Sequence, residues 1–318
     1  MQSGTRGNSL HIVQMMKLLP LLWLGLILSI LALAGCRRSE KPEAVWDGSD
    51  GRIRPLVYPR GIAYAPAADQ YFVVDRLAQI QRISGDGRFL NQWQMPAQQN
   101  GRPVNISVGP DGNIYIPDTH YHRVVVYTPD GKLLRQWGSF GTGPGQFTYL
   151  TDVAFDRQGR IFVSEYGDND RVQVFDANAR LLYQFGRFGQ GDGEFSRPQS
   201  MVIDNDLVYI TDACNHRIVV FTTQGQFVRA MGKAGSGPGE FRFPYGLDQA
   251  RDGNLVVTEF GNNRVQKIDK TTGKSIWIWG HTGRETGELA YPWAAVVNNN
   301  GQVVIADSGN NRLQILHR

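Results

Sequence analysis

Cysteine is almost absent from this chain of 318 residues, which contains only Cys36 and Cys214. Cys36 stands at the end of an N-terminal apolar run, and we expect its thiol to be modified. Cys214 is then left without a partner for an intrachain disulfide. The fold must therefore be held by its packed core rather than by cross-links.

A strong excess of charge of either sign is also lacking. The 33 Lys and Arg residues nearly balance the 29 Asp and Glu residues, and the formal net charge is +4. Two of these positive charges, Arg6 and Lys17, lie in the first 36 residues, which contain no acid. A nucleic-acid-binding domain usually carries a basic footprint, so we expect no nucleic-acid partner.

Amphipathic helices are the third absence. After residue 36, no segment shows the apolar spacing i, i+3, i+4, i+7. The chain has instead 37 Gly and 15 Pro residues, which separate short runs rich in Val, Ile, Tyr and Phe. This pattern predicts an all-β protein.

The N-terminus has the layout of a secretory signal. A positive residue, Lys17, precedes an apolar run from Leu18 to Gly35, and the run ends in "LALAGC". Small residues directly before a cysteine resemble a bacterial lipobox, which implies that residues 1–36 are a lipoprotein signal peptide and that Cys36 is lipidated. Residues 1–14 are expected to be an upstream extension, with Met15 or Met16 as the natural start. An uncleaved membrane helix is the alternative, because the run is long enough to span a bilayer.

The segment that follows is charged and poor in aliphatic residues. We interpret residues 37–50, "RRSEKPEAVWDGSD", as a tether between the lipid and a domain over residues 51–318. The expected location is the cell envelope, facing the periplasm or the exterior. In a bacterium with two membranes we expect the protein in the outer membrane. The residue after Cys36 is Arg37, whereas an inner-membrane retention signal has Asp at that position.

The rest of the chain repeats itself about every 47 residues. Six units open at Pro59, Pro103, Leu150, Pro198, Pro244 and Pro292. In each unit a second apolar run ends in an acid: Asp75, Asp118, Glu165, Asp212, Glu259 and Asp307. In units two to six an arginine opens the next run: Arg123, Arg171, Arg217, Arg264 and Arg312. Asp-Gly and similar turns separate the runs, as in β-hairpins.

Four antiparallel strands in each of six units predict a six-bladed β-propeller. The sixth unit stops at Arg318 after three strands, so its fourth strand must come from elsewhere in the chain. We predict that Gly51–Val57, "GRIRPLV", supplies it and that the ring closes by pairing N-terminal and C-terminal segments. Pro55 is tolerable there only because the strand would be an outermost edge.

The units resemble the NHL-repeat family. The segments "GRIFVSEYGDNDRVQVF", "GNLVVTEFGNNRVQKI" and "GQVVIADSGNNRLQIL" carry the resemblance best, and it extends over about residues 58–318. The family implies the propeller fold, but it includes scaffolds, binding proteins and a few enzymes. RNA binding, known for propellers of this family, is disfavoured by the secretory signal and by the near-neutral charge.

Features found in every unit are expected to belong to the scaffold. The recurring acid and the arginine five or six residues later should form an ion pair or a carboxylate-to-backbone bond that fixes the turn between them. The "GxGPGxF" stretches should be loops in which glycine supplies positive φ and the Phe packs between blades. No helix follows these loops, so a phosphate site of the glycine-rich type is not expected.

Positions that depart from the repeat are the candidates for a ligand site. The two positions after each opening proline should lie at the mouth of the central channel. Units five, six and one place Tyr245, Trp293 and Arg60 there, an aromatic and cationic arc suited to a peptide, a glycan or an anionic group. Units two to four supply a polar arc made of Asn105, Asp152, Gln199 and Ser200.

Metal and catalytic sites have weaker support. His122 and His216 occupy the slot before the arginine that other units fill with Asp or Asn, so we interpret them as repeat positions rather than zinc ligands. We expect no metal, no cofactor and no catalytic residue. The leading hypothesis is a lipid-anchored module that binds a protein, peptide or glycan of the cell envelope. The alternative is a propeller lyase or hydrolase with a channel metal, for which Arg60 and Tyr245 would be available but a clear histidine set is missing.

Replacing Cys36 with Ala should abolish labelling of the protein by a radioactive or clickable fatty acid, because the lipidated thiol is removed. The measurement is acyl labelling of the expressed full chain. Labelling that persists in Cys36→Ala would contradict the lipoprotein assignment.

Overall fold

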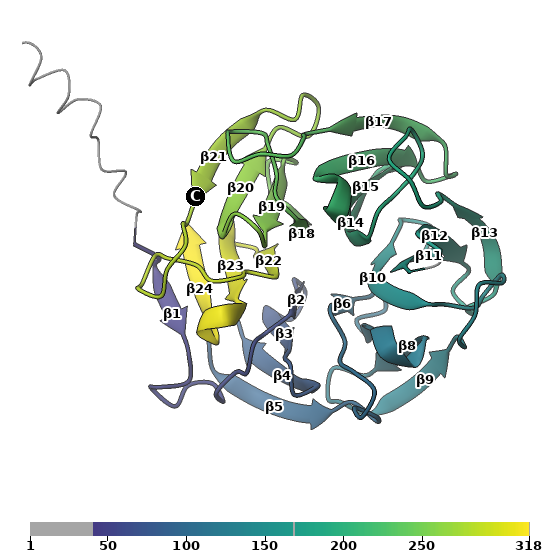
Figure 1. Cartoon of the computed structure of the whole chain (residues 1–318). Coiled ribbons are helices and arrows are strands. Elements are labelled where there is room, and N and C mark those ends of the chain that lie inside the picture. Colours follow the sequence, from purple (N-terminus) through teal and green to yellow (C-terminus); the bar gives the residue numbers. More distant parts are fainter. Residues whose placement is uncertain (1–40, 168, 318) are drawn as a thin grey trace, which may run out of the picture. The chain divides into compact units, whose positions relative to one another are not determined.

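Six four-stranded antiparallel sheets are arranged around a central axis as the blades of a propeller (Figure 1). The computed structural model describes residues 41–167 and 169–317. The predicted signal peptide and the lipidation site Cys36 lie outside these residues, as does the start of the predicted tether. The predicted all-β, six-bladed fold is confirmed.

The blades follow one another along the chain. Blade one contains β2 (Gly61–Ala65), β3 (Gln70–Val74), β4 (Gln79–Ser84) and β5 (Phe89–Gln94). Blade two contains β6 (Ser107–Val108), β7 (Ile114–Asp118), β8 (Arg123–Tyr127) and β9 (Leu133–Trp137). Blade three contains β10 (Tyr149–Phe155), β11 (Ile161–Tyr166), β12 (Arg171–Phe175) and β13 (Leu181–Phe185).

The second half of the ring repeats this order. Blade four contains β14 (Pro198–Asp204), β15 (Leu207–Asp212), β16 (Arg217–Thr222) and β17 (Phe227–Met231). Blade five contains β18 (Pro244–Gln249), β19 (Leu255–Glu259), β20 (Arg264–Ile268) and β21 (Ser275–Trp279). Blade six contains β22 (Ala294–Val297), β23 (Gln302–Asp307), β24 (Arg312–His317) and β1 (Ala44–Trp46).

Helical structure is limited to single turns. Three 3-10 helices, η1 (Thr119–Tyr121), η2 (Ala213–Asn215) and η3 (Ser308–Asn310), form the second-to-third-strand turns of blades two, four and six. Within residues 41–167 and 169–317, no helix has the length and apolarity needed to cross a membrane.

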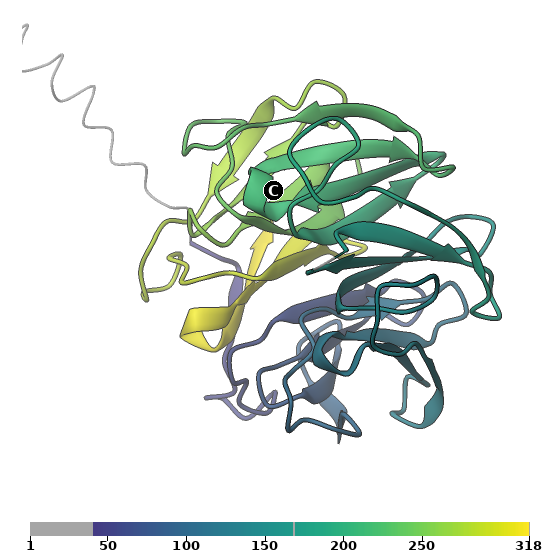
Figure 2. The same ribbon diagram turned by 45° about the vertical axis from the view of Figure 1, so that its right-hand side comes forward.

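The core lies between the blades rather than at the axis. All residues of β7, β12 and β19 are buried, because each of these strands is covered on both faces by neighbouring blades. The fourth strands alternate instead between partly buried and exposed residues, as in β17. Six apolar clusters result, one at each junction between neighbouring blades. Figure 2 shows the ribbon of these blades turned by 45°.

The ring closes through β1, which pairs antiparallel with β24 and places Trp46 opposite Leu313. Closure by N-terminal and C-terminal segments is confirmed, but the predicted strand Gly51–Val57 is wrong. At the five other junctions, 11 to 14 residues connect the fourth strand of one blade to the first strand of the next. A fourth strand at residues 51–57 would leave too few residues for this connection before β2 begins at Gly61. This segment is that connection, and its Ile53 and Leu56 are buried between blades one and six.

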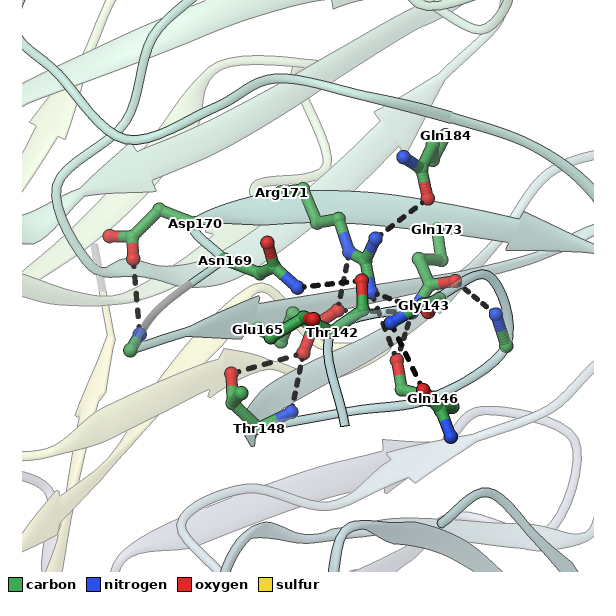
Figure 3. Close-up of polar contacts among 12 residues, drawn as sticks. Thr142, Gly143, Gln146, Thr148, Glu165, Asn169, Asp170, Arg171, Gln173 and Gln184 are labelled. Atoms are coloured by element: carbon green, nitrogen blue, oxygen red, sulfur yellow. Dashed lines mark hydrogen bonds and ion pairs between the residues drawn. The ribbon is translucent and has the colours of Figure 1, made fainter. Parts of the chain in front are cut away.

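The recurring acid and arginine form a buried ion pair, as predicted. In blade three, Glu165 accepts a hydrogen bond from Arg171 Nε at 2.7 Å and one from the backbone N–H of Thr148 at 2.7 Å (Figure 3). The Nη2 atom of Arg171 also donates to the carbonyls of Gly143 and Gln146, both at 3.0 Å. The pair therefore fixes the glycine-rich loop that enters the blade as well as the turn itself.

The apolar residue that ends each glycine-rich loop fills the junction between blades, as predicted. Phe147, Phe195 and Phe241 are completely buried, and Leu289 takes this place before blade six. Each packs in the cluster that joins two consecutive blades.

Trp46→Ala should lower the free energy of unfolding by about 3–5 kcal/mol, because it removes a buried ring from the junction that closes the propeller. Trp46 is 8% exposed and meets Tyr71 edge to face, with ring centroids 5.6 Å apart. The measurement is urea unfolding followed by circular dichroism. The control is Phe188→Ala, an aromatic truncation at a side chain that is 68% exposed and that should change stability little. Equal stability of Trp46→Ala and the parent would show that β1 does not close the ring.

Candidate functional site

The innermost strands approach one another closely around the channel. A Cβ atom on Gly61 would lie 2.7 Å from the Cα of Asn105, and one on Gly246 would lie 2.8 Å from the Cα of Ala294. Glycine is therefore required at these two points by the close approach of backbones. The same position carries a polar side chain in blades two to four, where the strands leave room.

Three of the predicted polar residues do come together, inside the channel rather than at its rim. Asn105 Nδ2 donates to Asp152 Oδ1 at 2.8 Å, and Ser200 Oγ donates to Asp152 Oδ2 at 3.4 Å. All three line a cavity of about 350 Å³. Asp152 and Ser200 are buried, so the prediction of an exposed polar arc at the mouth is wrong for them.

Asp152 holds the first strand of the next blade. Its carboxylate accepts the backbone N–H of Met201 at 2.7 Å and the backbone N–H of Val153 at 2.8 Å. An innermost strand leaves one edge without a partner, so a carboxylate that accepts its N–H groups closes that edge. Burial raises the pKa of Asp152 to about 7, against the effect of these hydrogen bonds.

A second channel carboxylate, Asp248, was missed by the sequence analysis. It accepts the backbone N–H of Val297 in blade six at 2.6 Å, and burial raises its pKa to about 6. Asp248 lies two residues after Gly246, and alternate residues of a strand share a face, so it also lines the cavity. Asp248 also departs from the repeat, because the other blades carry Ala, Ser or Val at the same position of the first strand. This departure is the sequence signal for the second carboxylate.

Where the first strands begin, the predicted aromatic and cationic arc is brought together. The guanidinium of Arg60 lies over the ring of Trp293, 5.2 Å from its centroid. Trp293 in turn meets Tyr245 at 5.0 Å between ring centroids. Tyr245 is only 7% exposed and stacks on Phe260, whereas Arg60 and Trp293 are half-buried. Burial lowers the pKa of Arg60.

Gln199 belongs to this aromatic arc rather than to the polar one. It is buried, and its Oε1 accepts a hydrogen bond from Arg197 Nε at 3.3 Å. Arg197 lies between two tyrosine rings, 4.9 Å from the centroid of Tyr166 and 5.1 Å from that of Tyr245. We name the group Arg60, Trp293, Tyr245, Arg197 and Tyr166 the mouth cluster.

Sequence analysis also missed Arg197, although its position offered a clue. Three blades place an aromatic residue directly before the opening proline, namely Tyr58, Phe243 and Tyr291, whereas blades two and four place Arg102 and Arg197 there. The backbone of Arg197 is left-handed, with φ of 63°, and its N–H is bound by Asp170. The guanidinium itself is held by the rings of Tyr166 and Tyr245 and by Gln199.

The two histidines of the turns act as repeat positions. His216 Nδ1 accepts the N–H of Phe243 at 3.1 Å, as Asn263 and Asn311 accept the N–H groups of Tyr291 and Tyr58. His122 Nδ1 contacts the carbonyl oxygen of Thr148 instead, so there the ring nitrogen must donate the hydrogen bond. In the part of the chain that the structure describes, no three His, Cys, Asp or Glu residues are grouped so that they could hold a metal ion.

Comparison with known families agrees with this architecture. A family model described as a 6-bladed beta-propeller matches residues 156–219 and 202–276, and the NHL repeat model matches residues 289–316. The chain is a six-bladed β-propeller, and it carries an NHL repeat at residues 289–316. No curated protein sequence matches the propeller.

Solved structures resemble the propeller in fold. A streptogramin B lyase is 16% identical with a TM-score of 0.61, and the match covers 82% of this chain and 93% of the lyase. A catalytically inactive virginiamycin B lyase from Staphylococcus aureus with quinupristin is 15% identical, with a TM-score of 0.58 and coverage of 81% and 80%. A protein of unknown function from Bacteroides thetaiotaomicron is 16% identical, with a TM-score of 0.65 and coverage of 82% and 69%. At these identities the likeness concerns the fold alone.

The raised pKa of Asp152 predicts a dependence of stability on pH. Because the folded carboxyl keeps its proton to a higher pH than the unfolded one, its contribution to stability is greatest at low pH and declines as pH rises from about 4 to about 7. Asp152→Asn should remove this decline, which amounts to at most about 1.4 kcal/mol for each unit of pKa difference. Chemical unfolding at pH 4 and pH 8 measures it, and an unchanged difference between the two pH values in Asp152→Asn would contradict it.

Proposed function

We propose that this propeller is a lipid-anchored, extracytoplasmic binding module that holds a protein, peptide or glycan at the mouth of its channel. The observation that carries the proposal is the mouth cluster, in which five side chains from different blades meet at positions that the repeat leaves free. The anchor rests on the sequence "LALAGC" and on Cys36.

The contacts within the mouth cluster support binding because they organise it in advance. Arg60 packs on Trp293 and Arg197 packs on Tyr245, and these two rings contact each other. Side chains that are already ordered lose little conformational entropy when a ligand arrives. Buried or half-buried Trp, Tyr and Arg residues are also the types that dominate binding energy at interfaces.

The backbone around the cluster adds to this order. The loops that enter blades three to six are fixed by the arginines of the ion pairs, which donate to loop carbonyls in every one of these blades. On the side of blades four to six the mouth is therefore formed by rigid turns, which hold Arg197, Tyr245 and Trp293.

Trp293→Ala and Arg60→Ala should each weaken binding of any ligand that the full chain selects from arrays of peptides and glycans. Loss of such an anchor typically costs about 2 kcal/mol or more, roughly thirtyfold in affinity. Affinity is measured by biolayer interferometry, with the melting temperature of each variant recorded beside it.

The matched control is Arg264→Ala, which removes a scaffold arginine. Arg264 is buried against Glu259 at 2.6 Å, so its loss leaves an uncompensated carboxylate and should reduce stability more than affinity. If both mouth variants keep full affinity for every selected ligand, the binding site lies on another face.

A further inference from the structure

We infer that the ligand is acidic, a peptide segment whose carboxylates are bound by the guanidinium groups of Arg60 and Arg197. This inference rests on the proposed function and names the chemistry of its ligand. It follows from the charges at the mouth, from the ring faces that are already covered, and from the spacing of the two arginines.

The arginines of the mouth differ from those of the scaffold in their partners. The scaffold arginines of blades two to six each pair with a carboxylate within 2.6 to 2.9 Å. Arg60 and Arg197 form no ion pair among the described residues, and neither do Arg76 and Arg102, which are the electrostatic neighbours of Arg60. The mouth therefore concentrates positive charge on a chain whose total is only +4.

The nearest carboxylates do not neutralise this charge directly, because they serve the backbone. Asp75 accepts the N–H groups of Val57, Leu77 and Gln79, and it is 1% exposed. Asp170 accepts the N–H of Gly167 as well as that of Arg197. Both acids lie beneath the turns, where the side chains of the mouth arginines do not bind them.

Free donors remain on both arginines. Arg60 makes no side-chain hydrogen bond within the described residues, and its Nε is buried without a partner. Arg197 uses only Nε, toward Gln199. The terminal nitrogens of both side chains are left to bind a ligand, and a planar guanidinium is suited to bind a carboxylate through two parallel hydrogen bonds.

The covered aromatic faces disfavour a neutral sugar or a nucleobase. Tyr245 stacks on Phe260 through one face and holds the guanidinium of Arg197 near its ring. Trp293 has Arg60 over its ring and meets three aromatic neighbours in edge-to-face contacts. Sugars and bases bind proteins largely by stacking on open rings, so these rings serve instead to position the arginines.

The spacing of the two arginines suits one short segment. Three successive contacts of about 5 Å, through Trp293 and Tyr245, separate Arg60 from Arg197. An extended peptide advances about 3.3 Å per residue, so acidic side chains a few residues apart can reach both guanidinium groups.

The test is fluorescence anisotropy of the full chain with a fluorescein-labelled peptide of eight glutamates. A peptide of eight glutamines and a single-stranded oligonucleotide of equal charge are the comparison probes. We expect the glutamate peptide to bind, the glutamine peptide not to bind, and the affinity to fall with added NaCl, since exposed charges are screened by salt.

The variants Arg60→Gln and Arg197→Gln should each weaken binding of the glutamate peptide about tenfold or more. Arg60→Lys and Arg197→Lys keep the charge and most of the packing but lose the planar fork, so they should recover only part of the affinity. The matched control is Arg180→Gln, in the turn between β12 and β13 at the opposite end of the blades, which removes the same charge and should leave affinity unchanged.

Each other outcome overturns the inference. No binding of the glutamate peptide, or equal binding of the glutamine peptide, excludes an acidic ligand, while the array experiment with Trp293→Ala still decides whether the mouth binds at all. Tighter binding of the oligonucleotide would replace the peptide with a nucleic acid. An equal loss in Arg180→Gln would show that the peptide responds only to overall charge.

Discussion

The propeller depends on a buried carboxylate that binds an arginine and a loop at the same time. Removing either partner would leave a buried charge without compensation, which typically costs about 3–5 kcal/mol. In blades three, five and six a glutamine completes the network: Gln173, Gln266 and Gln314 donate to the acid and accept an N–H from the loop. Blades then meet through these polar contacts at the mouth end and through apolar clusters along their length. The network explains why acid, arginine and loop recur together in the sequence.

The irregular part of the ring is where the network is incomplete. Blade one has Asp75 without an arginine, and in blade two Asp118 Oδ1 and Arg123 Nη2 are buried without partners. Burial accordingly raises the pKa of Asp118 to about 6. The connection into blade two lacks the glycine-rich loop that occupies the Arg nitrogens elsewhere, and it carries Arg102 instead. Three of the unpaired positive charges, Arg60, Arg76 and Arg102, therefore lie beside blades one and two, where the network is incomplete. Arg197 lies instead at blade four, where the pair of Asp212 and Arg217 is intact.

The repeat made the fold predictable, but it did not make the orientation of single side chains predictable. The same pattern occurs six times, so an ambiguous copy can be interpreted from the others. The number of blades, the ion pairs and the apolar residues that end the glycine-rich loops could therefore be predicted from the sequence. The closing strand did not, because β1 has only three residues and no repeat marks it. The site residues were misplaced because bulges interrupt the first strands between Leu150 and Asp152 and between Pro244 and Gly246. A bulge redirects neighbouring side chains, so the bulged residue Tyr245 faces the mouth, while Asp152, which follows the bulged residue Thr151, faces the cavity.

The first strands thus carry acidic side chains within them and arginines directly before them. Asp152 and Asp248 line the cavity, and their carboxylates serve to close the free edges of the inner strands. Arg60 and Arg197 hold the mouth and are stacked on rings rather than paired with acids. An anionic group at the mouth gains nothing by moving deeper, since it would leave the guanidinium groups and approach carboxylates in a region of low dielectric. The same carboxylates that complete the scaffold would therefore confine an acidic ligand to the rim, where the positions free of the repeat are found.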